Sequence, residues 1–215
     1  MAENLLEAQY DITKKSKLKR FYESNKILIF SSILILIILF GSFNFYSIKK
    51  EKEKILLSEN YVQAKIYLAN GKKSEAINIL RDVIFANDPA YSTLCLFLIL
   101  NEDLITDYRE LSVLFEHVLA NNKFEKEIRN LLIYKKSLLN SNFATESELL
   151  EGIKPLLNTE TLWKPHALLL LGDYFLSKQE YLKAKEFYTQ ILSINNLQKD
   201  LYNQARSQLS FIDHD

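Results

Sequence analysis

The stretch LLLLGDYFLSKQEYLKAKEFY, residues 168–188, is the part of the sequence that decides the fold. Apolar residues recur at helical spacing before and after the polar residues 177–180, which predicts two helices joined by a short turn. Gly172 and Ala184 are small, so the two helices can approach each other closely at these positions. The larger side chains that we expect to pack around them are Leu168, Leu171, Phe175 and Tyr188.

A weaker copy of this pattern lies nearer the N-terminus. Tyr67 lies near the end of the first helix of this copy, and Ala76 and Leu80 follow at the spacing of the later alanine and tyrosine. Ala76 and Ala184 are 108 residues apart, close to three periods of about 34 residues, and both copies resemble the spacing of the two-helix tetratricopeptide repeat (TPR). We therefore expect Tyr67, Ala76 and Leu80 to pack as their later counterparts do.

The intervening sequence indicates further helices with short turns. Asn70-Gly71 is typical of a helix end, and Asp88 is typical of an N-cap because proline follows it at the first helical position. Thr145-x-x-Glu148 and Ser177-x-x-Glu180 both match the capping-box pattern. The predicted helices cover residues 74–85, 89–100, 107–120, 123–139 and 147–157, a pair opening at Pro165 and after Ser177, and a last helix at 198–211.

This succession of helices predicts an all-α fold. The 167 residues after position 48 accommodate about four helix pairs plus a capping helix, arranged as a TPR-like α-solenoid. The middle pairs match the repeat only in length and apolar periodicity. An irregular helical bundle is therefore the alternative.

Residues 27–48 form a second decisive stretch. These 22 residues contain no Asp, Glu, Lys or Arg, and as a helix at ~1.5 Å per residue they match the ~30 Å hydrocarbon core of a bilayer. The stretch is too long for the apolar region of a secretory signal peptide and lacks a small-residue cleavage site, so we expect an uncleaved anchor. The predicted organisation is a cytoplasmic tail (1–26), a transmembrane helix (27–48) and a helical repeat domain (49–215), with the anchor continuing into the first repeat helix.

The charges beside the predicted anchor indicate its orientation in the membrane less strongly than its length indicates insertion. The tail carries six basic and four acidic residues, and the 20 residues after the anchor carry five lysines. The positive-inside rule therefore favours a cytoplasmic N-terminus by a narrow margin. Neither side has the clustered basic face of a nucleic-acid-binding protein.

The sequence offers no catalytic or metal-binding motif. Its three histidines, at positions 117, 166 and 214, lack zinc-ligand spacing, and its four glycines form no cofactor-binding loop. Cys95, the single cysteine, lies in an apolar run and is expected to be buried. We expect no enzyme activity, no cofactor and no metal, and a membrane-tethered hydrolase is the least supported function.

The order of parts resembles a bacterial family of TPR-like single-pass membrane proteins related to the ancillary subunit of the Sec translocon. The residues that carry the resemblance are residues 27–48, residues 67–80 with their Asn70-Gly71 turn, and Trp163-Lys164-Pro165-His166-Ala167 through Leu171-Gly172-Asp173-Tyr174 to Tyr188. The resemblance implies an inner-membrane protein with a periplasmic repeat domain. Its implied partners are translocon subunits, periplasmic chaperones or exported chains.

The resemblance also implies where partners bind. Stacked helix pairs form a groove lined by the first helix of each pair, which suits extended or helical peptide segments. The TPR groove positions fall on Tyr61 and Lys65 in the first matched repeat and on His166 and Asp173 in the last. The expected function is partner binding beside the export channel, and the alternative is an adaptor in envelope assembly or cell division.

Overall fold

The computed structural model describes residues 17–214 of the chain. The regular secondary structure of these residues is entirely α-helical and consists of nine helices. The all-α prediction is confirmed. Most of the predicted tail, residues 1–16, lies outside the described residues. The helices are α1 (Lys17–Ala69), α2 (Lys73–Phe85), α3 (Pro89–Asn101), α4 (Tyr108–Asn121), α5 (Lys126–Asn140), α6 (Glu146–Leu157), α7 (Lys164–Ser177), α8 (Tyr181–Leu192) and α9 (Lys199–His214).

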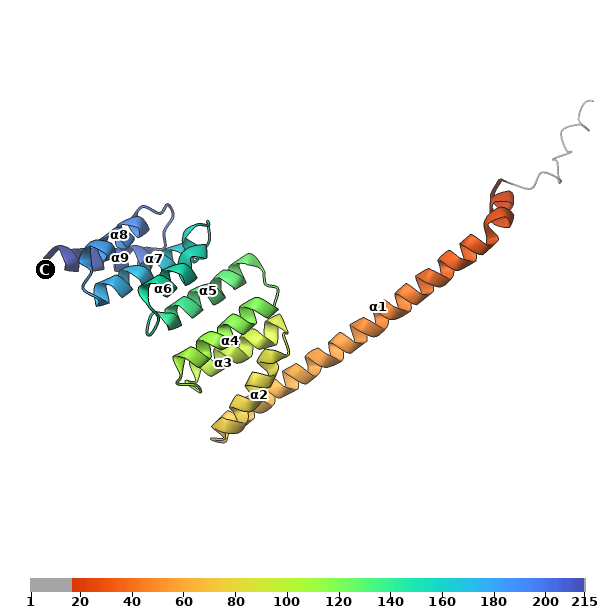
Figure 1. Cartoon of the computed structure of the whole chain (residues 1–215), viewed down its shortest axis with the longest axis horizontal. Coiled ribbons are helices and arrows are strands. Elements are labelled where there is room, and N and C mark those ends of the chain that lie inside the picture. Colours follow the sequence, from red (N-terminus) through yellow and green to blue (C-terminus); the bar gives the residue numbers. More distant parts are fainter. Residues whose placement is uncertain (1–16, 215) are drawn as a thin grey trace, which may run out of the picture. The chain divides into compact units, whose positions relative to one another are not determined.

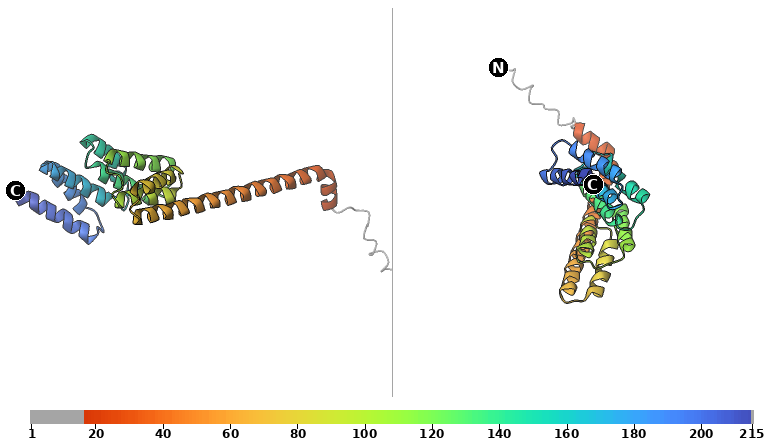
Figure 2. Two further views of the ribbon diagram at one scale, coloured as in Figure 1. Left: turned by 90° about the horizontal axis from the view of Figure 1, so that it is seen from below. Right: turned by 90° about the vertical axis from the view of Figure 1, so that its left-hand side faces the viewer.

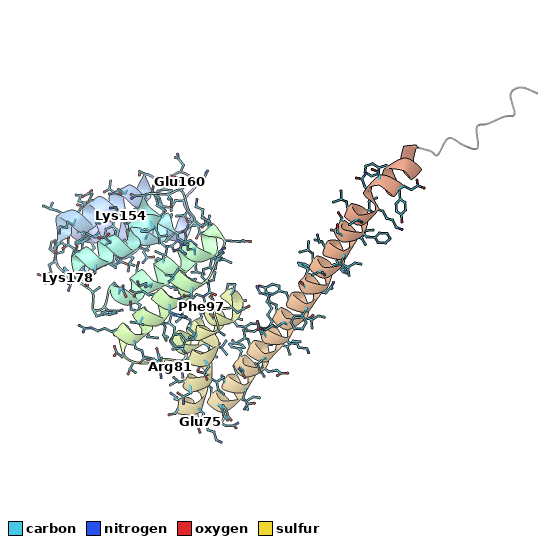
Figure 3. All side chains as sticks on the ribbon, turned by 45° about the vertical axis from the view of Figure 1, so that its right-hand side comes forward. Glu75, Arg81, Phe97, Lys154, Glu160 and Lys178 are labelled. Atoms are coloured by element: carbon cyan, nitrogen blue, oxygen red, sulfur yellow. The ribbon has the colours of Figure 1, made fainter. Side chains whose placement is uncertain are left out.

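Helix α1 contains the apolar stretch and is the one helix of the described residues that is long and apolar enough to cross a membrane. None of its most apolar 18-residue window is buried by other parts of the protein, and Figure 3 shows the side chains projecting all round the helix. The helix bends only at Asn25 (φ −116°, ψ 20°), whose side-chain amide donates to the Phe21 carbonyl at 3.1 Å. Beyond Asn25 it continues without a break past residue 48 to Ala69, as the sequence predicts.

Three of the four predicted helix boundaries are confirmed. Gly71 adopts φ +75° directly after α1 ends, Asp88 accepts hydrogen bonds from the N–H groups of residues 90 and 91, and Thr145 and Glu148 form a reciprocal capping box. The capping box predicted at Ser177 is wrong. Ser177 is the last residue of α7, where its hydroxyl donates to the Tyr174 carbonyl at 2.7 Å, so α8 begins without a side-chain cap.

The segment Leu57–Asp215 forms one compact unit that contains the last turns of α1 and all the later helices. In it, each helix from α2 onward packs against the next one in the chain, and α2 also contacts α4, α5 contacts α7, and α7 contacts α9. Figure 1 and the two views of Figure 2 show these helices lying side by side in sequence order. The unit is therefore built from neighbours in the sequence.

Two apolar cores fill this unit. The first extends from Ala64 of α1 through Leu96 and Phe115 to Leu132 of α5, and the second extends from Leu149 of α6 to Ala205 of α9. Helix α5 contributes to both, because its Leu132 and Leu139 belong to the first core while Ile133 and Tyr134 pack against the second. This helix therefore joins the two halves of the domain.

Candidate functional site

The residues predicted to pack within the two matched repeats lie in these cores. Tyr67 is partly buried, and the other eight are buried: Ala76, Leu80, Leu168, Leu171, Gly172, Phe175, Ala184 and Tyr188. The tightest approach is at Gly172, where a Cβ atom would stand only 2.5 Å from Cε1 of Tyr188. A larger residue than glycine at this position would force the Tyr188 ring to move.

A group of side chains with functional chemistry lies on α5 and α7. We call Tyr134, Trp163, His166 and Asp173 the α5–α7 cluster. The ring centroids of Tyr134 and Trp163 are 5.6 Å apart and nearly stacked, and the His166 ring lies 5.7 Å from Tyr134 and 5.3 Å from Trp163. Glu160 and Lys178, labelled in Figure 3, flank the helix that carries His166 and Asp173. All four residues of the cluster are partly exposed.

Local structure explains how the cluster is held. His166 and Asp173 are seven residues apart on α7, which is about two helical turns, so both lie on one face of that helix. Trp163 precedes this helix and donates its indole N–H to the Glu127 carbonyl of α5 at 3.1 Å. The Glu127 carboxylate accepts the Thr161 hydroxyl at 2.8 Å, so the connecting loop is fixed to the first turn of α5.

Asp173 is the electrostatic centre of the cluster. Its Oδ1 accepts the Tyr188 hydroxyl at 2.7 Å, and burial raises the pKa of this carboxyl group above its ordinary value despite that bond. The pKa of Tyr134 is raised by burial and then by the negative charge of Asp173. Burial, and then the bond to Asp173, likewise raise the pKa of Tyr188. The Asp173 carboxyl group is thus half-buried and hydrogen-bonded to the Tyr188 phenol.

This carboxylate has no positive partner. Within residues 17–214, the ion pairs join other residues, and none includes Asp173. His166 also has an unpaired polar atom, since its Nδ1 is buried without a hydrogen bond in the described part of the chain. Desolvated polar groups of this kind reduce folding stability unless they are paired.

The other two predicted contact residues lie in a second place, at the ends of α1 and α3. The Lys65 ammonium group is 5.9 Å from the centroid of the Tyr61 ring. Lys65 also lines an open cleft of ≈ 260 Å³ together with Leu68, Ala69, Leu98 and Glu102. The cleft thus combines one basic and one acidic residue with three apolar ones.

The four predicted contact residues therefore fall into two pairs, one at each end of the domain. The sequence reasoning missed Tyr134, Leu98 and Glu102, which come from helices without a recognisable repeat motif. Tyr134 comes from α5, whose partners the motif spacing does not identify. Its only sequence signal is an aromatic residue on a lysine-rich helix, which does not reveal a neighbour 29 residues later at Trp163.

The described residues offer little for metal binding or thiol chemistry. In the described part of the chain, no three His, Cys, Asp or Glu side chains are grouped so that they could hold a metal ion. Cys95 is buried, as predicted, and burial raises its thiol pKa to about 12, so it carries almost no thiolate at neutral pH.

Comparison with known proteins gives no further assignment. Neither a scan of the chain against family models nor searches of curated proteins and of solved structures found a match.

Proposed function

We propose that this chain is a membrane-anchored TPR-like scaffold whose helical domain binds protein partners at the bacterial cell envelope. One observation carries the proposal. Helix α1 continues without a break from an apolar stretch of transmembrane length, none of which packs on the protein, into residues 57–69, which pack in the domain's first core. A helix built this way would tether a folded domain to a membrane.

The contacts within the domain support a repeat architecture. Four helix pairs follow if the end of α1 is paired with α2, α3 with α4, α5 with α6, and α7 with α8, which leaves α9 as the capping helix. Contacts of α5 with α7 and of α7 with α9 fit such stacking, because first helices of successive repeats are neighbours in it. In the first half of the domain the corresponding contact is instead between second helices, α2 and α4. In this arrangement the α5–α7 cluster lies on the partner-binding side.

The family resemblance supports a place beside the secretion channel. In this proposal the N-terminus is cytoplasmic, the domain is periplasmic, and its partners are translocon subunits, periplasmic chaperones or exported chains. An adaptor in envelope assembly or cell division is the second candidate, since the same architecture suits it.

Site-specific crosslinking in native membranes tests the proposal. A photoreactive amino acid replaces Tyr134, with the highly exposed Leu182 of α8 as the control position. We expect translocon subunits, periplasmic chaperones or exported chains to be captured at position 134 and not at 182. Capture of unrelated cytoplasmic proteins alone would overturn it.

A depletion experiment distinguishes the two candidate functions. Slowed export of a reporter protein with normal septation supports the export function. Septation defects with normal export would favour the cell-division adaptor.

A further inference from the structure

We infer that the α5–α7 cluster is a subsite for a cationic side chain, arginine or lysine, of the bound protein partner. This inference rests on the proposed partner-binding function and specifies the chemistry of the partner. It is based on the one half-buried carboxylate of the cluster, Asp173, together with the aromatic rings of Tyr134, Trp163 and His166.

Asp173 has the properties of an anionic anchor. It lies on the same face of α7 as His166 and is held in place by the 2.7 Å bond from the Tyr188 hydroxyl. That bond occupies Oδ1 and leaves Oδ2 for a ligand. Among the described residues, no basic side chain lies within 4.0 Å of Asp173. An incoming guanidinium or ammonium group would provide the missing charge.

The rings beside Asp173 suit the same ligand. Cations bind favourably to the faces of Trp and Tyr, and guanidinium groups also stack on them. Helix α5, which carries Tyr134, packs against α7. The Tyr134 ring contacts the rings of Trp163 and His166. Asp173 lies on the same face of α7 as His166, about 10 Å further along the helix, so an extended arginine side chain of a partner that lies along this face would reach from a ring to the carboxylate.

Asp173 also contrasts with three other acidic residues of the domain. Glu110, Glu116 and Glu146 each lie within 4.0 Å of a basic side chain of this chain. They are already neutralised locally. Asp173 differs because it is both desolvated and unpaired among the described residues.

The single tryptophan of the chain, Trp163, allows a direct test. The full chain in detergent is titrated with the peptide acetyl-Ala-Ala-Arg-Ala-Ala-amide and with the same peptide carrying citrulline, a neutral isostere of arginine. Trp163 fluorescence and the NMR signal of its indole N–H report binding. We expect saturable changes with the arginine peptide and at least about 10-fold weaker binding of the citrulline peptide, because only arginine supplies the charge.

Two variants show whether the response comes from Asp173. Asp173→Asn keeps an oxygen acceptor for Tyr188 and removes the negative charge, so it should weaken arginine-peptide binding about 10-fold. Glu151→Gln removes one charge from the exposed face of α6 and should leave binding unchanged. Equal affinity for both peptides, or unchanged binding by Asp173→Asn, would overturn the inference.

The peptide titration and the crosslinking experiment test the cation subsite and the export function separately. If position 134 crosslinks to export proteins while arginine and citrulline peptides bind equally, only the cation subsite is wrong. If the arginine peptide binds as expected while crosslinking recovers none of the proposed partners, the subsite stands and the export function fails.

Discussion

Two glycines in this chain show how the same residue type serves different surroundings. A Cβ atom at Gly172 would stand 2.5 Å from the Tyr188 ring, whereas a Cβ atom at Gly41 in the apolar part of α1 would meet nothing within 4 Å. The contrast extends to the leucines, since Leu171 is fully buried and Leu36 is 64% exposed. One apolar region is therefore packed within the protein, whereas the other is exposed and is long and apolar enough to cross a membrane.

The largest expected effect is on the exposed region. The double substitution Ile35→Arg with Ile38→Arg places two charges at the middle of the proposed anchor and should raise its free energy of membrane insertion by roughly 5–7 kcal/mol. The protein should then be extracted from membranes by alkaline carbonate. Val62→Arg lies on the same helix beyond the apolar stretch and should leave the protein membrane-bound. Retention of the double variant would show that the stretch is not the anchor.

The second effect is on the buried region. Leu171→Ala should lower the free energy of unfolding of the domain by about 2–5 kcal/mol, because it leaves a cavity in a packed core. Urea unfolding followed by Trp163 fluorescence measures this change. Leu36→Ala is the matched control and should leave the same unfolding curve unchanged. Equal effects of the two substitutions would remove the distinction between the regions.

A smaller effect is expected at the glycines themselves. Gly172→Ala should destabilise the domain by about 1–3 kcal/mol, because the added methyl group overlaps the buried Tyr188 ring. Gly41→Ala should leave domain stability unchanged. The measurement is again urea unfolding, and a Gly172→Ala domain as stable as the wild type would contradict the close approach of α7 and α8.

The smallest effect concerns the charge on Asp173. Burial raises its pKa in the folded state, so its contribution to stability is fully present below the ordinary aspartate value of 3.8 and is lost as pH rises through the raised pKa. At neutral pH, Asp173→Asn should therefore raise the melting temperature slightly, and the gain should shrink as pH falls toward 3.8. A variant that melts below the wild type at pH 7 would indicate that the charge stabilises the fold.

Much of the fold is predictable from the sequence because its signals are local. Asp88 and Thr145 cap helices through residues two or three positions away, and an apolar run of 22 residues is recognisable by itself. The failure at Ser177 has the same origin. Its pattern is that of a capping box, but α7 extends through this residue, and its hydroxyl bonds back to Tyr174.

Only some residues of the α5–α7 cluster were predictable from the sequence as contact residues. His166 and Asp173 come from a motif with defined spacing, whereas Tyr134 reaches them through the packing of α5 on α7. That no basic side chain of the described residues lies within 4.0 Å of Asp173 is also a property of the three-dimensional packing. Sequence periodicity describes one helix at a time, so it does not reveal which side chains of another helix complete a site.

Protease accessibility in spheroplasts tests most directly the claim that an uncleaved anchor holds the domain in the periplasm. Trypsin is added to intact spheroplasts expressing the full chain, and an antibody to the domain follows the product by size, with a cytoplasmic protein as the integrity control. We expect the chain to be membrane-bound at full length before trypsin is added, and its lysine-rich sites after residue 48 to be cut at once. A domain that stays protected until detergent is added would face the cytoplasm, and its periplasmic placement would be wrong.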